Sequence, residues 1–324
     1  MKTLSIVFFL AWVGINAVFF HVFGVIVSRP DLGDLSFHLA RGMYGPVPDY
    51  PPLFAMLLGI CGPSNVVLMY VLVSGAVLFL AVPDMTRAIA AQLYDARESE
   101  AAALLALIGS SAAEVILVDS IIPQGITLLL MLFAVFFVVR DLKRRGDHWE
   151  TVMLLIVVLC LAALTHRVAV YPVGLLILFW MLCRLFPNGF LPGVFIFGLS
   201  LIGAFVSLGL LFNPRALFQI LSKYVNPILI YLAWKGFPRG PLVFSVPCFP
   251  ILFSIALILS TGPLEQDGRP LLMLFPFLAV LGGRGVSSCI QPEKARRWVK
   301  YLFWLFAFNF GLLMGGVVAM NIPQ

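Results

Sequence analysis

Apolar runs long enough to cross a membrane recur along the whole length of the chain. Crossing about 30 Å of hydrocarbon takes roughly 20 apolar residues in a helix. Every backbone N–H and C=O group in lipid must also be paired inside its own segment, which favours helices. The predicted fold is therefore an all-α, polytopic transmembrane helical bundle, and its candidate spans are residues 4–27, 65–83, 101–118, 123–139, 151–165, 169–186, 193–212, 218–234, 241–260, 271–287 and 301–320.

Composition excludes a soluble globular domain. Hydrophobic residues make up 61% of the chain and charged residues 11%, whereas a soluble domain carries about 25% charged residues. The net charge of +6 comes from short basic clusters beside the spans. Such clusters are topology signals, so we expect membrane lipids around the chain and no nucleic-acid partner. A single transmembrane domain is predicted for residues 1–324.

Charge also predicts the topology of the bundle. The basic loops 140–150 and 284–300 are both expected to face the cytoplasm. They lie on the same side of the membrane only if an even number of helices lies between them. The doubtful segment 218–234 must therefore also cross the membrane. The result is about eleven crossings, with a cytoplasmic N-terminus. Residues 84–100 then form a solvated stretch on the cytoplasmic side.

This topology gathers most of the other ionisable residues on the non-cytoplasmic face of the plasma membrane or of the endoplasmic reticulum. Acids, histidines and arginines mixed on one face indicate a functional site. These outward residues are Asp31, Asp34, His38, Asp49, Asp119, His166, Arg167, Arg215, Glu265, Asp267 and Arg269.

The first external loop, residues 28–51, carries the densest polar cluster. A short interfacial helix over 34–43 would place Asp34, His38 and Arg41 on one face, at i, i+4 and i+7. Tyr50 then precedes a Pro-Pro pair at the re-entry into the membrane. A carboxylate beside a histidine can take a proton from a hydroxyl group. The alternative is that Asp34 only caps the helix.

Several short motifs, in order along the chain, carry a resemblance to a known family. "GDLSFH" and then "YPPL" follow the first span, and "DSIIPQ", "THRVAVYP" and "DGRPLLMLFPFLAVLGG" come later. In this order the motifs resemble the GT-C superfamily of polytopic glycosyltransferases, which use polyprenyl-phosphate-linked sugars. The resemblance implies a GT-C-like bundle and an inverting sugar transfer. A small lipid or glycan is the expected acceptor.

The resemblance also implies roles for individual residues. Asp34 would activate the acceptor hydroxyl group, and Asp119 would orient the acceptor or help to hold a divalent ion. Whether Mg²⁺ or Mn²⁺ takes part stays open, because no cluster has metal-ligand spacing. A leaving phosphate needs cations or fixed donors. The candidate substrate-binding residues are His38, Arg41, Tyr50, His166, Arg167, Arg215, Lys223 and Arg269.

Other interpretations compete with this one. Taken singly, each outward cation is also explained as an anchor at the lipid headgroups, and Asp119 as a helix-end residue. For the whole chain, a lipid or small-molecule transporter or flippase would show inverted repeats and mid-membrane charges. A lipid-linked glycan polymerase or ligase would carry its key residues in one large external loop. A scaffold subunit would tolerate the loss of Asp34.

Overall fold

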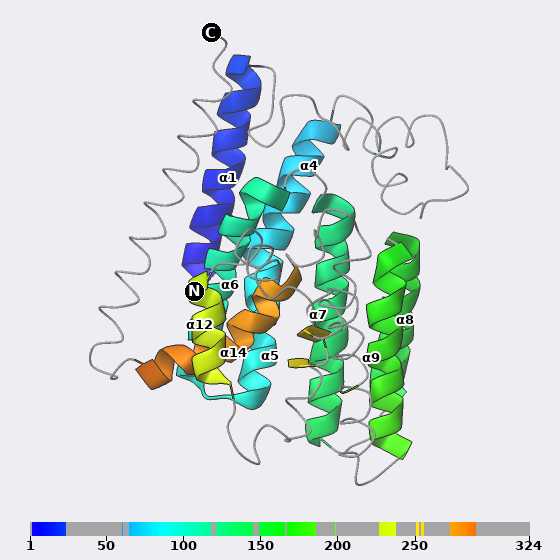
Figure 1. Cartoon of the computed structure of the whole chain (residues 1–324). Coiled ribbons are helices and arrows are strands. Elements are labelled where there is room, and N and C mark those ends of the chain that lie inside the picture. The colour runs from blue at the N-terminus through cyan, green and yellow to red at the C-terminus, as the bar shows by residue number, and fades with distance from the viewer. Residues whose placement is uncertain are drawn as a thin grey trace, which may run out of the picture.

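The computed structural model describes residues 2–23, 60, 65–117, 121–144, 149–165, 167–185, 198, 227–237, 251–252, 254–255 and 273–289. Nearly all of them are helical, which confirms the predicted all-α fold for this part of the chain. The helices are α1 (Lys2–Phe23), α4 (Val66–Gly75), the π-helix η1 (Ala76–Ala81), α5 (Val82–Leu93), α6 (Ala96–Leu117), α7 (Ile121–Arg144), α8 (Trp149–Thr165), α9 (Arg167–Leu185), α12 (Pro227–Gly236) and α14 (Leu274–Cys289) (Figure 1).

The helix boundaries follow the predicted spans closely. The helices α7 and α8 cover the segments predicted at 123–139 and 151–165, and α9 covers all but the last residue of the segment predicted at 169–186. The stretches Val71–Leu93 and Gly125–Lys143 are long and apolar enough to cross a membrane. Much of the chain predicted to span elsewhere lies outside the described residues, so the total of eleven crossings stays a prediction. The segments concerned are the interfacial helix at 34–43, the span at 301–320, residues 218–226 of the span at 218–234, and all but a few residues of the spans at 193–212 and 241–260.

A proline explains the wide turn in the helix that runs from Val66 to Leu93. Pro83 has no N–H group, and in a regular helix its ring would clash with the carbonyl group four residues earlier. The π-helix η1 lies just before Pro83, and the N–H of Val82 bonds to the carbonyl oxygen of Val77, five residues back. The hydroxyl group of Thr86 donates to the carbonyl oxygen of Val82 over 2.8 Å. The backbone therefore remains helical through the proline.

The prediction of a solvated stretch at 84–100 is wrong. Helix α5 continues to Leu93 and α6 begins at Ala96, so only a tight turn separates them. Ile89 and Ala90 are fully buried, because apolar side chains recur at helical spacing on one face of α5. Asp95 caps α6 by accepting a hydrogen bond from the N–H of Glu98 at 2.8 Å. The stretch is a packed helical hairpin with one charged face.

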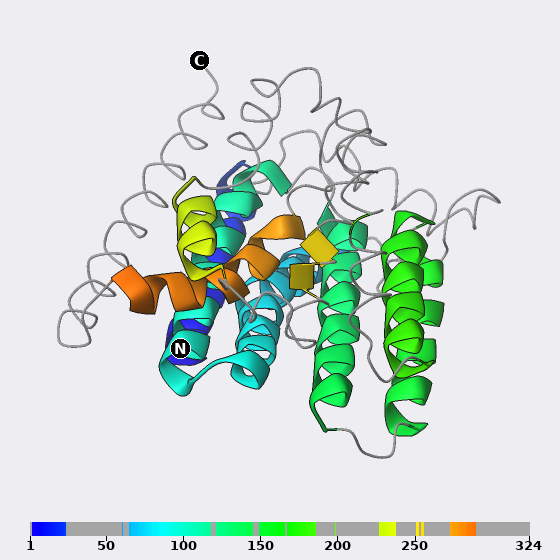
Figure 2. The same cartoon turned by 60° about the horizontal axis from the view of Figure 1, so that its bottom comes forward.

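Small residues let α14 approach its neighbours at backbone distance. Figures 1 and 2 show α14 running obliquely past α6 and α12. A Cβ atom added at Gly285 would lie 2.0 Å from the carbonyl oxygen of Leu232 on α12. One added at Gly283 would lie 2.3 Å from the carbonyl oxygen of Glu98 on α6. Glycine is therefore needed at both positions, as in closely packed membrane helices.

Substituting Gly285 by alanine is expected to destabilise the bundle. The new methyl group would meet backbone, which cannot rotate away, so we expect a loss of at least about 1–3 kcal/mol in the free energy of unfolding. Gly174→Ala is the matched control, because nothing lies within 4 Å of a Cβ atom added there. Alanine in that open helical position should stabilise by roughly 0.5–1 kcal/mol. Unfolding of both purified variants in detergent should shift in opposite directions, and equal shifts would contradict this packing.

The outer surface of the described bundle is apolar. Helix α8 leaves a row of large side chains exposed along its length, and α9 adds Leu178 and Met181. Such continuous apolar exposure is unusual on a protein surrounded by water. The exposed side chains of α8 are Met153, Leu154, Ile156, Val157, Leu161 and Leu164.

Candidate functional site

Two side-chain hydrogen bonds join helix ends that carry charged residues, on the lower side of the bundle in Figure 1. Lys143 at the end of α7 donates to the carbonyl oxygen of Gln92 on α5 over 2.7 Å. Ser287 at the end of α14 donates to a carboxylate oxygen of Glu98 on α6 over 2.9 Å. These bonds confirm that the start of the 284–300 segment lies at the same end as 84–100 and Lys143. The prediction of eleven crossings had assumed this arrangement.

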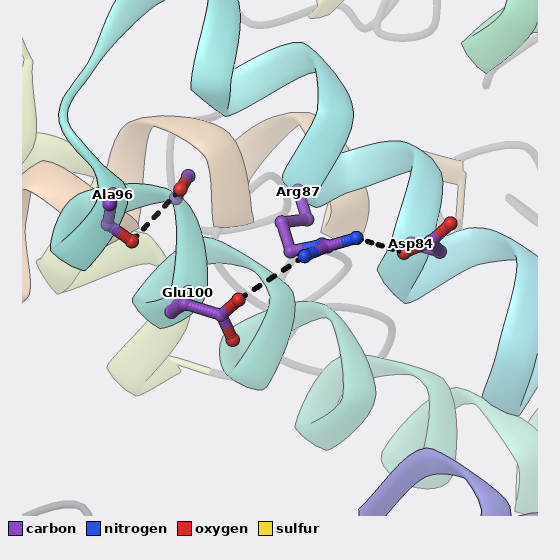
Figure 3. A network of polar contacts seen from close by, with 5 residues as sticks. Asp84, Arg87, Ala96 and Glu100 are labelled. Atoms are coloured by element: carbon purple, nitrogen blue, oxygen red, sulfur yellow. Dashed lines mark hydrogen bonds and ion pairs between the residues drawn. The ribbon is translucent and has the colours of Figure 1, made fainter. Parts of the chain in front are cut away.

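An ion-pair network on α5 and α6 forms the most polar part of this end. The guanidinium group of Arg87 donates to Asp84 over 2.8 Å and to Glu100 over 3.4 Å. Figure 3 shows the Arg87 side chain between the two acids, which come from different helices. All three side chains are at least a third exposed, so the network is accessible to solvent and ligands and adds little stability.

A pocket of about 230 Å³ adjoins this network, between α1, the junction of η1 with α5, and α6. Its polar lining comes from Lys2 and Ser5 on α1 and from Asp84 and Arg87 on α5. Both signs of charge therefore face one cavity. The rest of the wall is apolar and is formed by Ile6, Leu80, Pro83 and Ala103.

A second ion pair, between α7 and α9, is buried. Asp141 is 5% exposed and accepts hydrogen bonds from the indole N–H of Trp180 at 2.6 Å and from Nε of Arg184 at 2.9 Å. A second guanidinium nitrogen of Arg184 donates to the backbone carbonyl oxygen of Asp141 at 3.0 Å. Paired in this way, the buried carboxylate keeps its charge compensated and joins the two helices.

Sequence analysis missed this buried pair. Asp141 stands next to Arg140 and close to other basic residues, so it looked like part of a solvated cluster. One signal was present, because Trp180 and Arg184 are one helical turn apart at the end of α9 and so share a face. A tryptophan and an arginine on one face make a donor pair for a carboxylate on another helix.

Most of the predicted site residues lie outside the described residues, so their roles stay predictions. Only Arg167 is placed, as the first residue of α9, and nothing is described of its side chain. Asp119 falls between the end of α6 and the start of α7, and His166 between α8 and α9. The others outside the described residues are Asp34, His38, Arg41, Tyr50, Arg215, Lys223 and Arg269.

The helices that flank these positions end on the upper side of the bundle in Figure 1, at different heights and across its width. Helix α1 begins at the pocket beside Asp84, and its other end lies toward the top of the bundle (Figure 1). The end of α6 and the start of α7 lie at that upper end, as do the end of α8 and the start of α9. The C-terminal ends of α1, α6 and α8 and the N-terminal ends of α7 and α9 therefore lie on the side of the bundle away from the charged network.

Within the described part of the chain, no group of three or more His, Cys, Asp or Glu residues could hold a metal ion. Comparison with known proteins finds no matching family model, no matching curated protein and no matching solved structure.

Proposed function

We propose that this chain is a multi-pass membrane glycosyltransferase with a GT-C-like bundle and a short interfacial helix in its first external loop. It would move a sugar from a polyprenyl-phosphate donor to a lipid or glycan acceptor, with inversion at the anomeric carbon. The N-terminus would be cytoplasmic, and the reaction would take place at the non-cytoplasmic face of the plasma membrane or of the endoplasmic reticulum.

The exposed surface supports a membrane location. The apolar row on α8 would face lipid tails, which cover such side chains without cost. Large aromatic side chains stand exposed at the charged end, where Trp149 is 67% and Trp234 is 60% exposed. Lys235 lies 5.2 Å from the ring of Trp234. Tryptophan beside lysine is typical of the level of the lipid headgroups.

The observation that carries the proposal is the separation of the two ends of the bundle. Lys143 of the 140–150 segment and Ser287 of the 284–300 segment lie at the lower end, which the positive-inside rule assigns to the cytoplasm. Helices α1, α6 and α8, which precede Asp34, Asp119 and His166 in the sequence, end on the other side of the bundle. The arrangement supports one shared site on the non-cytoplasmic face.

The proposed chemistry is a single displacement. The acceptor hydroxyl oxygen bonds to the anomeric carbon, and the bond from that carbon to the phosphate oxygen breaks, with its electron pair leaving on the phosphate. Attack opposite to the leaving group inverts the configuration. Asp34 takes the hydroxyl proton, and Arg167 and Arg269 stabilise the charge on the phosphate. Asp119 orients the acceptor or holds a divalent ion.

A donor panel tests the proposal. The full chain is purified, reconstituted in vesicles and incubated with radiolabelled polyprenyl-phosphate sugars and lipid extracts as acceptors. We expect label to move from at least one donor into a new glycolipid, with an inverted anomeric configuration by NMR. Label that crosses the vesicle membrane on an unchanged donor would instead identify a transporter. Absence of product with every donor and acceptor would contradict the proposed activity.

A further inference from the structure

The pocket beside the Asp84–Arg87–Glu100 network lies at the end of the bundle opposite the proposed sugar transfer, which does not use it. We propose that this pocket binds the headgroup of an ethanolamine phospholipid. Lys2 and Ser5 hold the phosphate group, and Asp84 holds the ammonium group.

The charges around the pocket fit a ligand that carries both signs. Lys2 and Arg87 are cationic and Asp84 is anionic, and all three line the cavity. Arg87 is shared between Asp84 and Glu100, so its charge is already balanced and it mainly fixes the position of the Asp84 carboxylate. The Lys2 ammonium group forms no ion pair with another described residue. One free cation and one fixed carboxylate match a phosphate joined to an ammonium group.

Ser5 adds a hydroxyl group to the same site. The residue is 7% exposed and lines the cavity, and its hydroxyl group donates to no other residue that the structure describes. It can therefore donate to a ligand in the cavity. Ser5 also closes the first turn of α1, where the N–H groups of Lys2, Thr3 and Leu4 have no partner inside the helix and the helix dipole is positive. A phosphate oxygen would satisfy these donors.

The size and the apolar wall of the cavity favour a lipid headgroup. The volume of about 230 Å³ is below the roughly 300–1,000 Å³ of pockets for drug-sized ligands, so it suits one small polar group. Ile6 and Leu80 belong to the apolar side of the cavity, and Ile6 is 49% exposed on the outer surface of α1. The glycerol and the first carbons of the acyl chains would lie along this surface.

Ethanolamine is favoured over choline because its ammonium nitrogen carries hydrogen atoms that can be donated. A primary ammonium group has three N–H donors for a carboxylate, whereas a trimethylated ammonium group has none. An anionic lipid without an amine would leave Asp84 facing negative charge. The inference rests on the membrane location proposed above and is independent of sugar transfer.

Native mass spectrometry of the full chain in maltoside micelles tests the site. The tag is placed at the C-terminal end, away from Lys2. Phosphatidylethanolamine, phosphatidylcholine and phosphatidylglycerol are titrated separately, together with glycerophosphoethanolamine, which has the headgroup without the acyl chains. We expect one phosphatidylethanolamine to bind about tenfold more tightly than either other lipid. The soluble headgroup should bind at least about tenfold more weakly than the lipid.

Three variants locate the binding. Ser5→Ala and Lys2→Gln are each expected to weaken phosphatidylethanolamine binding about tenfold, since each loses one donor to the phosphate. Ser5→Ala breaks no hydrogen bond among the described residues, so the fold should persist. Asp84→Asn should weaken phosphatidylethanolamine binding and strengthen phosphatidylglycerol binding, which reverses the preference. Arg97→Gln, an exposed cation near the same turn, is the control and should change nothing.

Each outcome bears on the proposal. Weaker phosphatidylethanolamine binding in the three variants, together with unchanged binding in Arg97→Gln, supports the site. Binding of all lipids with equal affinity, or unchanged phosphatidylethanolamine binding in Ser5→Ala and Lys2→Gln, would overturn it. Equal binding of the soluble headgroup would show that the ligand is not a lipid. Because these titrations contain no sugar donor, their failure leaves the transferase assay unaffected, and the reverse also holds.

Discussion

Asp34→Asn is expected to lower sugar transfer by about 10²–10⁴-fold, the usual contribution of a positioned general base. Asparagine has nearly the same size and can still accept a hydrogen bond, but it cannot take the proton of the acceptor hydroxyl group. Turnover should fall, and the affinity for the donor should change little, because the donor phosphate is assigned to the arginines. Initial rates with the best donor of the panel give both quantities.

Asp31→Asn is the matched control, since Asp31 precedes Asp34 in the same external loop. It carries the same change of charge and should keep nearly full activity. Equal transfer by wild type and Asp34→Asn would remove Asp34 from the mechanism. Equal losses in both variants would show that the loop needs only its negative charge.

The sequence could predict the helices because their signal is local. A run such as 151–165 is apolar in every position but its ends, and it appears as α8 almost unchanged. The shared end of the basic loops was also predictable, because positive charge near a span indicates which of its ends faces the cytoplasm. Two loops on one side must then be separated by an even number of crossings. Both arguments use neighbours in sequence and need no tertiary structure.

The packing between helices could not be predicted in the same way. The hairpin of α5 and α6 looked solvated, because its charges are visible in the sequence while the buried face of Ile89 and Ala90 depends on a partner. The run "GGRG" at 282–285 would allow another helix to pack closely against it, but the sequence does not say which one. Only the structure identifies α6 and α12 as the partners. The pocket beside Lys2 joins residues 2–6 to residues 80–103, a separation at which one sequence carries no pairing signal.

Arg184→Met is expected to destabilise the bundle by about 3–5 kcal/mol, because it leaves the Asp141 carboxylate buried without its cation. Asp141→Asn should cost less, about 1–3 kcal/mol. The amide oxygen can still accept the bond from Trp180, and the Arg184 side chain is 25% exposed, so its charge can reach solvent. Arg184→Met should therefore lower the stability more than Asp141→Asn, because the charge that it leaves unpaired is the more deeply buried one.

The double variant shows whether loss of the ion pair between Asp141 and Arg184 causes the lower stability of the single variants. With Asp141→Asn and Arg184→Met combined, no buried charge remains, so the double variant should be more stable than Arg184→Met alone. Glu150→Gln is the control, since this acid is 85% exposed and 3.8 Å from Arg140, and should cost less than about 1 kcal/mol. Denaturant unfolding in mixed micelles gives all four values. Additive losses in the double variant would mean that Asp141 and Arg184 act separately, and the link between α7 and α9 would then rest on their apolar contacts.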